Sequence, residues 1–413
     1  MYDTVRLDRR LIKTAKLLAN SPTSPINEAC GDWASTQAAY RLFDNDKASP
    51  EAILEPHTHA TAKRMAACGE PVLVAQDTVF FYYGQHPKTE GLGPIGNSDD
   101  EHGLIMHNAL AFTSSGVPLG LLSQNIWARR EVPEEGYQEK ILRLQCMAIE
   151  EKESSKWLRA LQETVERTPP GVKVVTVADR ESDFFEFLTQ AEEVRARVLI
   201  RARTDRMLVP EESEGFESIL EALGNATALG TLTVKIPGNG KRKARTAEIE
   251  VRVAQVTIKP PQRRGNAKAS GSTEPISVKV IGATESAPPA GQEAISWVLL
   301  TNLLVPDFEA AAEKVQWYGK RWGIETWHKV LKSGCKVEDC LLETAERLSR
   351  YLTLFSIIGV RLMHVALPGA SAAGPAGHRG VLQRGNRSAA CSCPQPTAAG
   401  EIPDLARSGP HDR

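Results

Sequence analysis

The sequence contains no long apolar run and few cysteines. No stretch of its 413 residues approaches roughly 18 consecutive apolar residues, so we expect no transmembrane helix. No signal-peptide pattern precedes the first charged residues. The seven cysteines are scattered without paired C-x-x-C spacing, and reduced thiols are the simplest interpretation. These absences predict a cytoplasmic protein.

The chain also lacks a large net charge of either sign. Its formal net charge is −1, so the total charge does not point to a nucleic-acid partner. The balance differs locally, because residues 235–264 carry nine Lys or Arg against two Glu. Such a run is either a solvated loop or a surface that contacts phosphates.

A polar pattern, Y-x2-R-x3-E-x6-K, stands near the end of the chain in YGKRWGIETWHKVLK. The sequence predicts one helix over 309–332, on which Tyr318, Arg321, Glu325 and Lys332 fall within an arc of roughly 60°. The apolar residues of the same segment fall on the opposite side. The pattern fits a site that holds a metal and phosphates together, and it equally fits a solvated face with an i,i+4 ion pair.

Two upstream apolar runs lead directly into an aspartate: VLVAQD ends at Asp77 and VVTVAD ends at Asp179. Short β-branched runs of this kind predict strands buried on both faces. The carboxyl end of such a strand is where open α/β sheets place their sites. Asp77, Asp179 and Glu325 are therefore candidates to converge, although each aspartate alone is also typical of a turn or a helix cap.

Three carboxylates at one point repel each other unless cations neutralise them. Hard oxygen ligands favour Mg²⁺ or Mn²⁺. Two such ions, about 3.5–4 Å apart, form the usual clamp for in-line phosphoryl transfer. The pattern thus indicates metal-dependent phosphoryl chemistry.

Several segments together resemble the DDE transposases of the insertion-sequence-four group. They occur in the family's order and cover about residues 5–366. The N-terminal likeness runs from LDRRLIKTAKLLA to TQAAYRLFDN, and the others are QDTVFFYY, EEKESSKWL, VADRESD, SWVLLTN and YGKRWGIETWHKVLKSG. The last segment carries the family's Y-R-E-K signature without a departure.

The resemblance implies an α/β fold: a ribonuclease-H-like catalytic domain with an inserted β-rich subdomain and an N-terminal helical DNA-binding domain. Composition and periodicity place the boundaries, and residues 138–166 read as one helix within the first part of the core. The expected units are an end-DNA-binding domain at 1–65, the catalytic core at 66–204 and 297–366, the β-rich insertion at 205–296, and a tail at 367–413.

The resemblance also assigns roles. It implies that Asp77, Asp179 and Glu325 ligate two Mg²⁺ ions, with Mn²⁺ as a substitute, and that Tyr318, Arg321 and Lys332 hold phosphates. Further DNA contacts are implied for Trp297, as the stacking surface for a flipped base, for Arg201, and for Arg9, Arg10 and Lys13 on a basic amphipathic helix. Arg180 and Glu181 are candidates to support the ligands.

The implied activity is cut-and-paste transposition in the nucleoid. A nick frees a 3′-hydroxyl, a hairpin forms and is reopened, and the end is joined to target DNA. The partners are transposon inverted-repeat ends, target DNA and a second copy of the chain in a synaptic homodimer. A related nuclease of the same fold and a DNA-binding inhibitor of transposition are the alternatives.

Residues 367–413 depart from the family pattern. They contain no Phe, Trp or Tyr and few large aliphatics, so the sequence predicts a disordered tail that cannot offset its ordering entropy. A truncated or frame-shifted C-terminus is our preferred interpretation, with a natural linker as the alternative. Dimerisation of this chain is accordingly in doubt.

Overall fold

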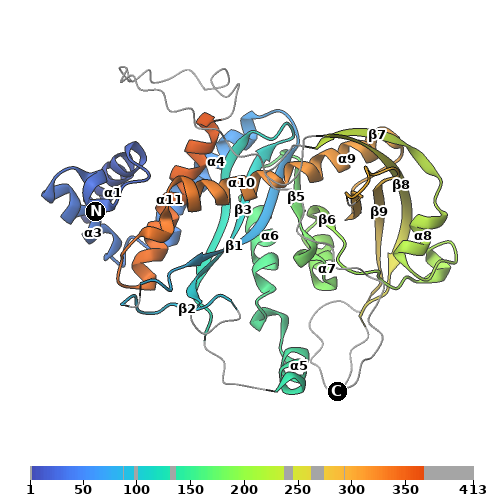
Figure 1. Ribbon diagram of the computed structural model, residues 1–413, viewed down its shortest axis with the longest axis horizontal. Coiled ribbons are helices and arrows are strands. Elements are labelled where there is room, and N and C mark those ends of the chain that lie inside the picture. The colour runs from blue at the N-terminus through green and yellow to red at the C-terminus, as the bar shows by residue number, and fades with distance from the viewer. Residues whose placement is uncertain are drawn as a thin grey trace.

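The computed structural model describes residues 2–86, 88–96, 101–130, 136–236, 245–261, 274–292 and 294–366. These residues form a ten-stranded mixed sheet with helices packed against it and a helical unit at one end (Figure 1). The α/β class expected from the sequence is confirmed. The tail predicted at 367–413 lies outside the described residues.

The strands follow each other in the sheet as β2-β3-β1-β5-β6-β10-β9-β8-β7, with β4 paired to the free side of β3. Their bounds are β1 Val72–Tyr82, β2 Gly93–Pro94, β3 His102–Thr113, β4 Pro118–Trp127, β5 Val174–Ala178, β6 Arg197–Arg201, β7 Ala228–Ile236, β8 Arg245–Ile258, β9 Ile276–Glu285 and β10 Ser296–Thr301. Only the β1–β5 and β5–β6 pairs of these strands are parallel. The antiparallel meander expected between 70 and 130 is formed by β1, β3 and β4.

Helices cover both faces of the sheet. Their bounds are α1 Tyr2–Asn20, α2 Ile26–Cys30, α3 Trp33–Phe43, α4 Pro50–Ala67, α5 Tyr137–Cys146, α6 Ser155–Arg167, α7 Phe185–Glu193, α8 Ile219–Asn225, α9 Phe308–Lys320, α10 Trp322–Lys329 and α11 Ala345–Ala366. Helix α6 packs on the face formed by Val72 and Val74, whereas α10 and α11 pack on the face that carries Ala75 and Val79. Alternate residues of a strand point to opposite faces, so Asp77 lies on the α10 side.

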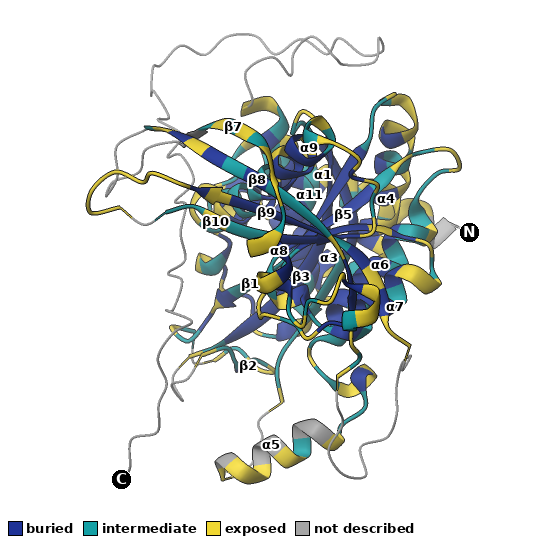
Figure 2. Cartoon of the chain, turned by 90° about the vertical axis from the view of Figure 1, so that its right-hand side faces the viewer, coloured by how far each residue is buried: buried dark blue, intermediate teal, exposed yellow. Residues whose placement is uncertain are grey.

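The strands of the centre are the most buried part of the molecule (Figure 2). Burying a polar side chain on such a sheet costs free energy unless the side chain has a hydrogen-bond or ionic partner. The polar residues on β1 and β3 therefore need a structural or functional explanation.

Strands β7, β8 and β9 come from the segment expected to be a β-rich insertion. They continue the same sheet, because β9 pairs with β10 from Ser296↔Thr284 to Thr301↔Lys279. Helix α8 packs against β8 and β9 at that end of the molecule (Figure 1). The segment is thus β-rich as expected, and it extends the core sheet instead of forming a sheet of its own.

Two predicted helices are each split. The segment predicted as one helix at 138–166 forms α5 and α6, with a turn of 3₁₀-helix at Ile149–Glu151 between them. The segment predicted at 309–332 forms α9, α10 and a π-helical turn, Val330–Gly334. The backbone N–H of Arg321 bonds to the carbonyl of Tyr318, three residues back, so the helix tightens at this junction. Hydrophobic periodicity does not register such a break, because the apolar face continues across it.

A glycine at the junction allows close packing. A Cβ atom at Gly323 would lie 2.7 Å from the ring of Phe112 on β3. Only glycine therefore lets the start of α10 approach the sheet this closely. This approach brings the first turn of α10 next to β1.

The helices α1, α2 and α3 form a unit at one end of the molecule, beside α11 (Figure 1). Leu7, Leu11 and Ala15 of α1 pack against the core that α11 contributes to. The closing helix predicted at 347–365 is α11, which is slightly longer. Among the helices that the structure describes, none is long and apolar enough to span a membrane.

Candidate active site

The three candidate carboxylates interact through their charges. Burial raises the pKa of Asp77 to about 7; Arg321 opposes this, and the nearby charges of Asp179 and Glu325 add to it. Burial also raises the pKa of Glu325, against the effect of Arg321 and with a further contribution from Asp179. The three carboxylates therefore lie near enough to one another to affect the pKa of Asp77 and of Glu325.

Strand register explains how the two aspartates meet. The sequence predicted that Asp77 ends its strand, and this is wrong. Asp77 lies in the middle of β1, opposite Asn108 of β3. The parallel neighbour β5 is the strand that ends here, and its last registered pair with β1 is Ala75↔Val177. Two further steps along both strands bring Asp77 beside Asp179. The expected position at the carboxyl end of a strand is therefore that of Asp179, which follows the shorter strand β5.

Asp179 also caps the turn that follows β5. Its Oδ1 accepts a hydrogen bond of 2.9 Å from the backbone N–H of Glu181, at the start of the 3₁₀-helix Arg180–Ser182. The cap function and a ligand function are compatible, because a carboxylate has lone pairs on two oxygens. Lys156 on α6 lies 3.5 Å from Glu181 Oε2, so the N-terminus of α6 is tied to this turn.

Arg321 lies between two of the carboxylates. Its Nη2 is 2.5 Å from Glu325 Oε1, and its Nη1 is 3.8 Å from Asp77 Oδ2. Only 8% of its side chain is exposed, against 16% for Asp77 and 33% for Glu325. Arg321 and Tyr318 are both buried, which argues against the solvated face that the sequence left open as an alternative.

The donor set fits a divalent cation, but its present spacing does not. Carboxylate oxygens are the ligands that Mg²⁺ and Mn²⁺ prefer, and buried carboxylates that raise one another's pKa gain from a cation between them. Within the described ranges, however, no group of three His, Cys, Asp or Glu side chains is arranged to hold one metal ion. The guanidinium of Arg321 takes one Glu325 oxygen instead.

Tyr318 and Trp297 pack together beside the carboxylates. Their rings meet edge to face with centroids 5.2 Å apart, and Trp297 is half-buried near the start of β10. Arg201, on β6, donates from Nη2 to the carbonyl of Ser296 over 3.1 Å. Burial raises the pKa of Tyr318, so its phenol stays protonated and can donate a hydrogen bond.

Lys332 has different partners from the other residues of the Y-R-E-K pattern. It lies in the π-helical turn after α10, where its Nζ is 3.1 Å from Glu338 Oε1 and stands over the ring of Phe81. It remains partly exposed at 36% of its side chain.

His328 is a residue of this site that the sequence analysis missed. Its Nδ1 is 3.7 Å from Asp77 Oδ2, and burial, with smaller effects of Lys332 and Arg321, lowers its pKa to about 3. The ring is therefore neutral at ordinary pH, and its Nε2 has no hydrogen-bond partner. The spacing E-x-x-H from Glu325 was the available signal, since residues three apart share a helix face.

The basic residues of α1 differ in their surroundings. Arg9 is exposed and Arg10 is half-buried. Lys13 donates from Nζ to Ser35 Oγ over 2.9 Å, and Ser35 in turn donates to Asp32, which caps α3. Arg9 is therefore the freest of the three to meet a ligand, whereas Lys13 also links α1 to α3.

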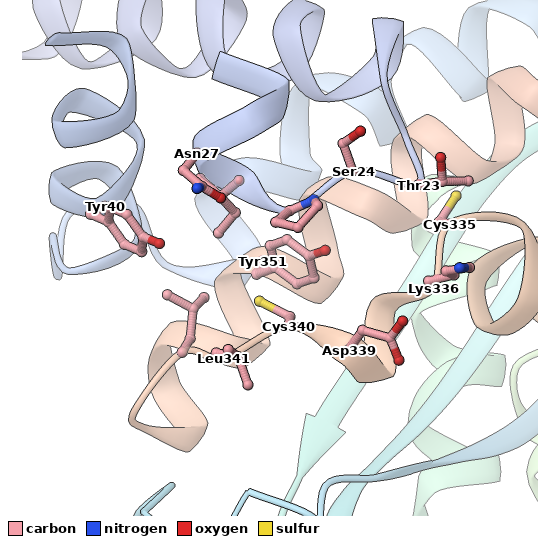
Figure 3. Close-up of a pocket in the computed structure, with 13 residues that line it drawn as sticks. Thr23, Ser24, Asn27, Tyr40, Cys335, Lys336, Asp339, Cys340, Leu341 and Tyr351 are labelled. Atoms are coloured by element: carbon pink, nitrogen blue, oxygen red, sulfur yellow. The ribbon is translucent and has the colours of Figure 1, made fainter. Parts of the chain in front are cut away.

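A pocket of about 340 Å³ lies away from the carboxylates, between the N-terminal helices and the segment that precedes α11. Figure 3 shows Tyr40, Cys340 and Tyr351 around it. Burial raises the pKa of the Cys340 thiol to about 12, so this thiol is unreactive.

Of the basic run at 235–264, Arg245 and Arg252 are described and pair with Glu285 and Glu250, while 237–244 and 262–264 lie outside the described residues.

Stability without divalent cations is expected to fall as the pH rises. The folded-state pKa of Asp77 is about 7 against an ordinary 3.8, so its contribution is fully present below pH 3.8 and is lost as pH rises through 7. Asp77→Asn removes this dependence. In EDTA, the melting temperature of the variant should exceed that of the unmodified chain more at pH 8 than at pH 5.

Calorimetry at both pH values measures this difference, with the exposed Glu193→Gln as the control. A gap between variant and unmodified chain that stays constant from pH 5 to pH 8 would contradict the raised pKa of Asp77.

Comparisons with known proteins match two parts of this chain to transposase families. A family model described as "Transposase DDE domain" matches residues 146–358, and one described as "Transposase DNA-binding" matches residues 3–48. Among solved structures, the chain is similar to a piggyBac transposase in a synaptic complex with hairpin DNA. That similarity has a TM-score of 0.34 at 9% identity, and covers 87% of this chain and 69% of the other.

Proposed function

Since this chain belongs to the transposase DDE domain family and also matches the family's DNA-binding model, we propose that it cleaves and joins DNA with Asp77, Asp179 and Glu325. The family match contains Asp179 and Glu325 but begins after Asp77. The assignment of Asp77 therefore rests on the register of β1 against β5 and on its electrostatic coupling to the other two carboxylates. That coupling is the observation that carries the proposal.

The three carboxylates would hold divalent ions, two Mg²⁺ with Mn²⁺ as a substitute. Such ions supply activation of the attacking hydroxyl and neutralise charge on the transferred phosphate. The chain's own residues do the positioning. The guanidinium of Arg321 offers a bidentate fork to a phosphate, Tyr318 offers its hydroxyl, and Lys332 offers a point charge.

We further propose that the chain is a member of the insertion-sequence-four group, with a likeness to the transposase of transposon five. The core would then be ribonuclease-H-like, with 205–296 as its insertion and 1–65 as the end-binding domain. Arg9, Arg10 and Lys13 would contact end DNA, Arg201 would contact DNA near the cut, and two copies would act together on two ends. The exposure of Arg9 supports the first of these roles.

The reaction proposed is a nick that frees a 3′-hydroxyl, followed by hairpin formation, hairpin opening and transfer to target DNA. The test is a gel-shift assay paired with a cleavage assay on end DNA, a duplex with the inverted repeat that flanks the gene. Binding with Mg²⁺-dependent 3′ nicking and strand transfer is expected. Binding without cleavage would instead favour a DNA-binding inhibitor, and cleavage without strand transfer a related nuclease.

Trp297→Ala is expected to nick the first strand normally and to stall at hairpin formation. The half-buried indole would stack on a base extruded as the DNA bends, and such stacking is worth about 1–3 kcal/mol per base. Nicked and hairpin products resolved on a denaturing gel measure the two steps separately. Trp297→Phe, which keeps an aromatic face, should recover part of the hairpin yield.

The competing interpretation is that Trp297 is only a packing partner of Tyr318. In that case nicking and hairpin formation would fall together in Trp297→Ala, and the melting temperature would drop with them.

A further inference from the structure

Arg321 makes its shorter ion pair with Glu325, which the proposed function requires as a metal ligand. Its Nη2 stands 2.5 Å from Glu325 Oε1, one turn along the same helical segment, and its Nη1 stands 3.8 Å from Asp77 Oδ2. A divalent ion held by Glu325 would bind the carboxylate whose Oε1 already contacts Arg321, so the two cations would repel each other at short range. Arg321 and the metal are therefore competitors for one position.

The burial of these groups explains why a cation is required there at all. Asp77 and Glu325 are only partly exposed and have Asp179 nearby, so the three carboxylates would repel one another without a positive charge between them. Arg321 provides that charge from within the chain.

The guanidinium is not fully satisfied in this position. Its Nε and Nη1 are buried and have no hydrogen-bond partner, although a guanidinium has five N–H donors. A buried donor without a partner costs free energy, so a ligand that accepts from it is favoured. A phosphate is such a ligand, because its oxygens match the guanidinium fork.

We propose that Arg321 is an internal counter-ion that keeps Glu325 from the metal until a DNA phosphate takes the guanidinium. This inference rests on the proposed function. Phosphate and metal then bind cooperatively, because each draws one member of the Arg321–Glu325 pair away from the other. By linkage the effect is reciprocal: DNA strengthens metal binding by the same factor as metal strengthens DNA binding. The chain would thereby acquire its cleavage ions only at a DNA site.

The test is Mn²⁺ binding to the full-length chain, measured from the electron paramagnetic resonance signal of free Mn²⁺. Without DNA, Arg321→Gln should bind Mn²⁺ about 10-fold or more tightly than the unmodified chain, within the usual range of coupling between two sites. End DNA should tighten Mn²⁺ binding to the unmodified chain by a similar factor. It should do so much less for Arg321→Gln, which has no guanidinium to release.

The matched control is Arg159→Gln. Arg159 forms an i,i+4 pair with Glu163 at 2.9 Å, as Arg321 does with Glu325, but on the exposed side of α6 and away from the other carboxylates. This variant should bind Mn²⁺ as the unmodified chain does. A gain equal to that of Arg321→Gln would mean that lost positive charge alone is responsible, and would overturn the inference.

If Arg321→Gln folds too poorly for the Mn²⁺-binding measurement, its melting temperature tests the same proposal. In EDTA this variant should melt below the unmodified chain, and saturating Mn²⁺ should raise its melting temperature more than that of the unmodified chain. An equal Mn²⁺ effect on both would overturn the proposal.

The two proposals fail differently. If Mn²⁺ binds the unmodified chain tightly both with and without end DNA, the counter-ion role is wrong while the metal site stands. If Mn²⁺ binds no form of the chain even with end DNA, the metal assignment of the three carboxylates is itself wrong, and the counter-ion role falls with it.

Discussion

Replacing Asp77, Asp179 or Glu325 by alanine is expected to abolish Mg²⁺-dependent nicking of end DNA. Each loss should be about 10³-fold or more, since groups that act together on one transition state are not additive and removing any one removes most of their effect. Nicked product from a labelled duplex, measured under single-turnover conditions, gives the rate. Asp77→Ala is the most informative variant, because Asp77 precedes the family match and its role rests on strand register.

The variants must also be shown to be folded and to bind DNA. Each variant should unfold in one cooperative transition in EDTA, and its gel shifts should remain close to those of the unmodified chain. Glu193→Ala, an exposed acidic control, should cleave normally. An alanine variant that retains near-full cleavage would remove that residue from the catalytic group. If Asp77 alone were dispensable, the third carboxylate would have to be sought elsewhere on the α10 side of the sheet.

The double variant Arg9→Ala, Arg10→Ala is expected to lose end-DNA affinity by about 10- to 100-fold at physiological salt, because each lost phosphate contact retains counterions on the DNA. The slope of log affinity against log salt should become shallower by about 1.8 for two contacts. Fluorescence anisotropy over a salt series measures both quantities. Catalysis on DNA that is bound at saturation should be nearly unchanged.

Lys173→Ala, in an exposed turn before β5, is the control for a general loss of charge. Because Arg10 is half-buried, the melting temperature of the double variant should be measured as well. An unchanged salt slope together with a lower melting temperature would assign these arginines to packing of α1 instead of DNA contact.

Local sequence patterns predicted most of the elements for a physical reason. The β-branched runs before Asp77 and Asp179 form strands, and the apolar segment at 347–365 forms a helix, because side-chain period and burial act over a few residues. The patterns did not predict where a helix ends when the end is set by packing against a distant part of the chain. The segment predicted at 309–332 breaks at Arg321, where Gly323 lets α10 approach Phe112.

The site divides in the same way. The sequence indicated the carboxylates and the basic residues beside them, since their chemistry is carried by residue type and spacing. It predicted the wrong place on its strand for Asp77, and it did not reveal His328. Both depend on neighbours distant in the sequence: β5 ends beside the middle of β1, and α10 folds back over the same strand.

What the sequence by itself determined is which groups this protein can use: three carboxylates, an arginine and a tyrosine on one helical segment, and a basic N-terminal helix. The tertiary structure alone decided that Arg321 is buried between Asp77 and Glu325 instead of exposed beside them. The reason is electrostatic. Once strand register and helix packing bring the carboxylates together with little access to water, a cation among them is strongly favoured, and Arg321, four residues before Glu325, supplies it.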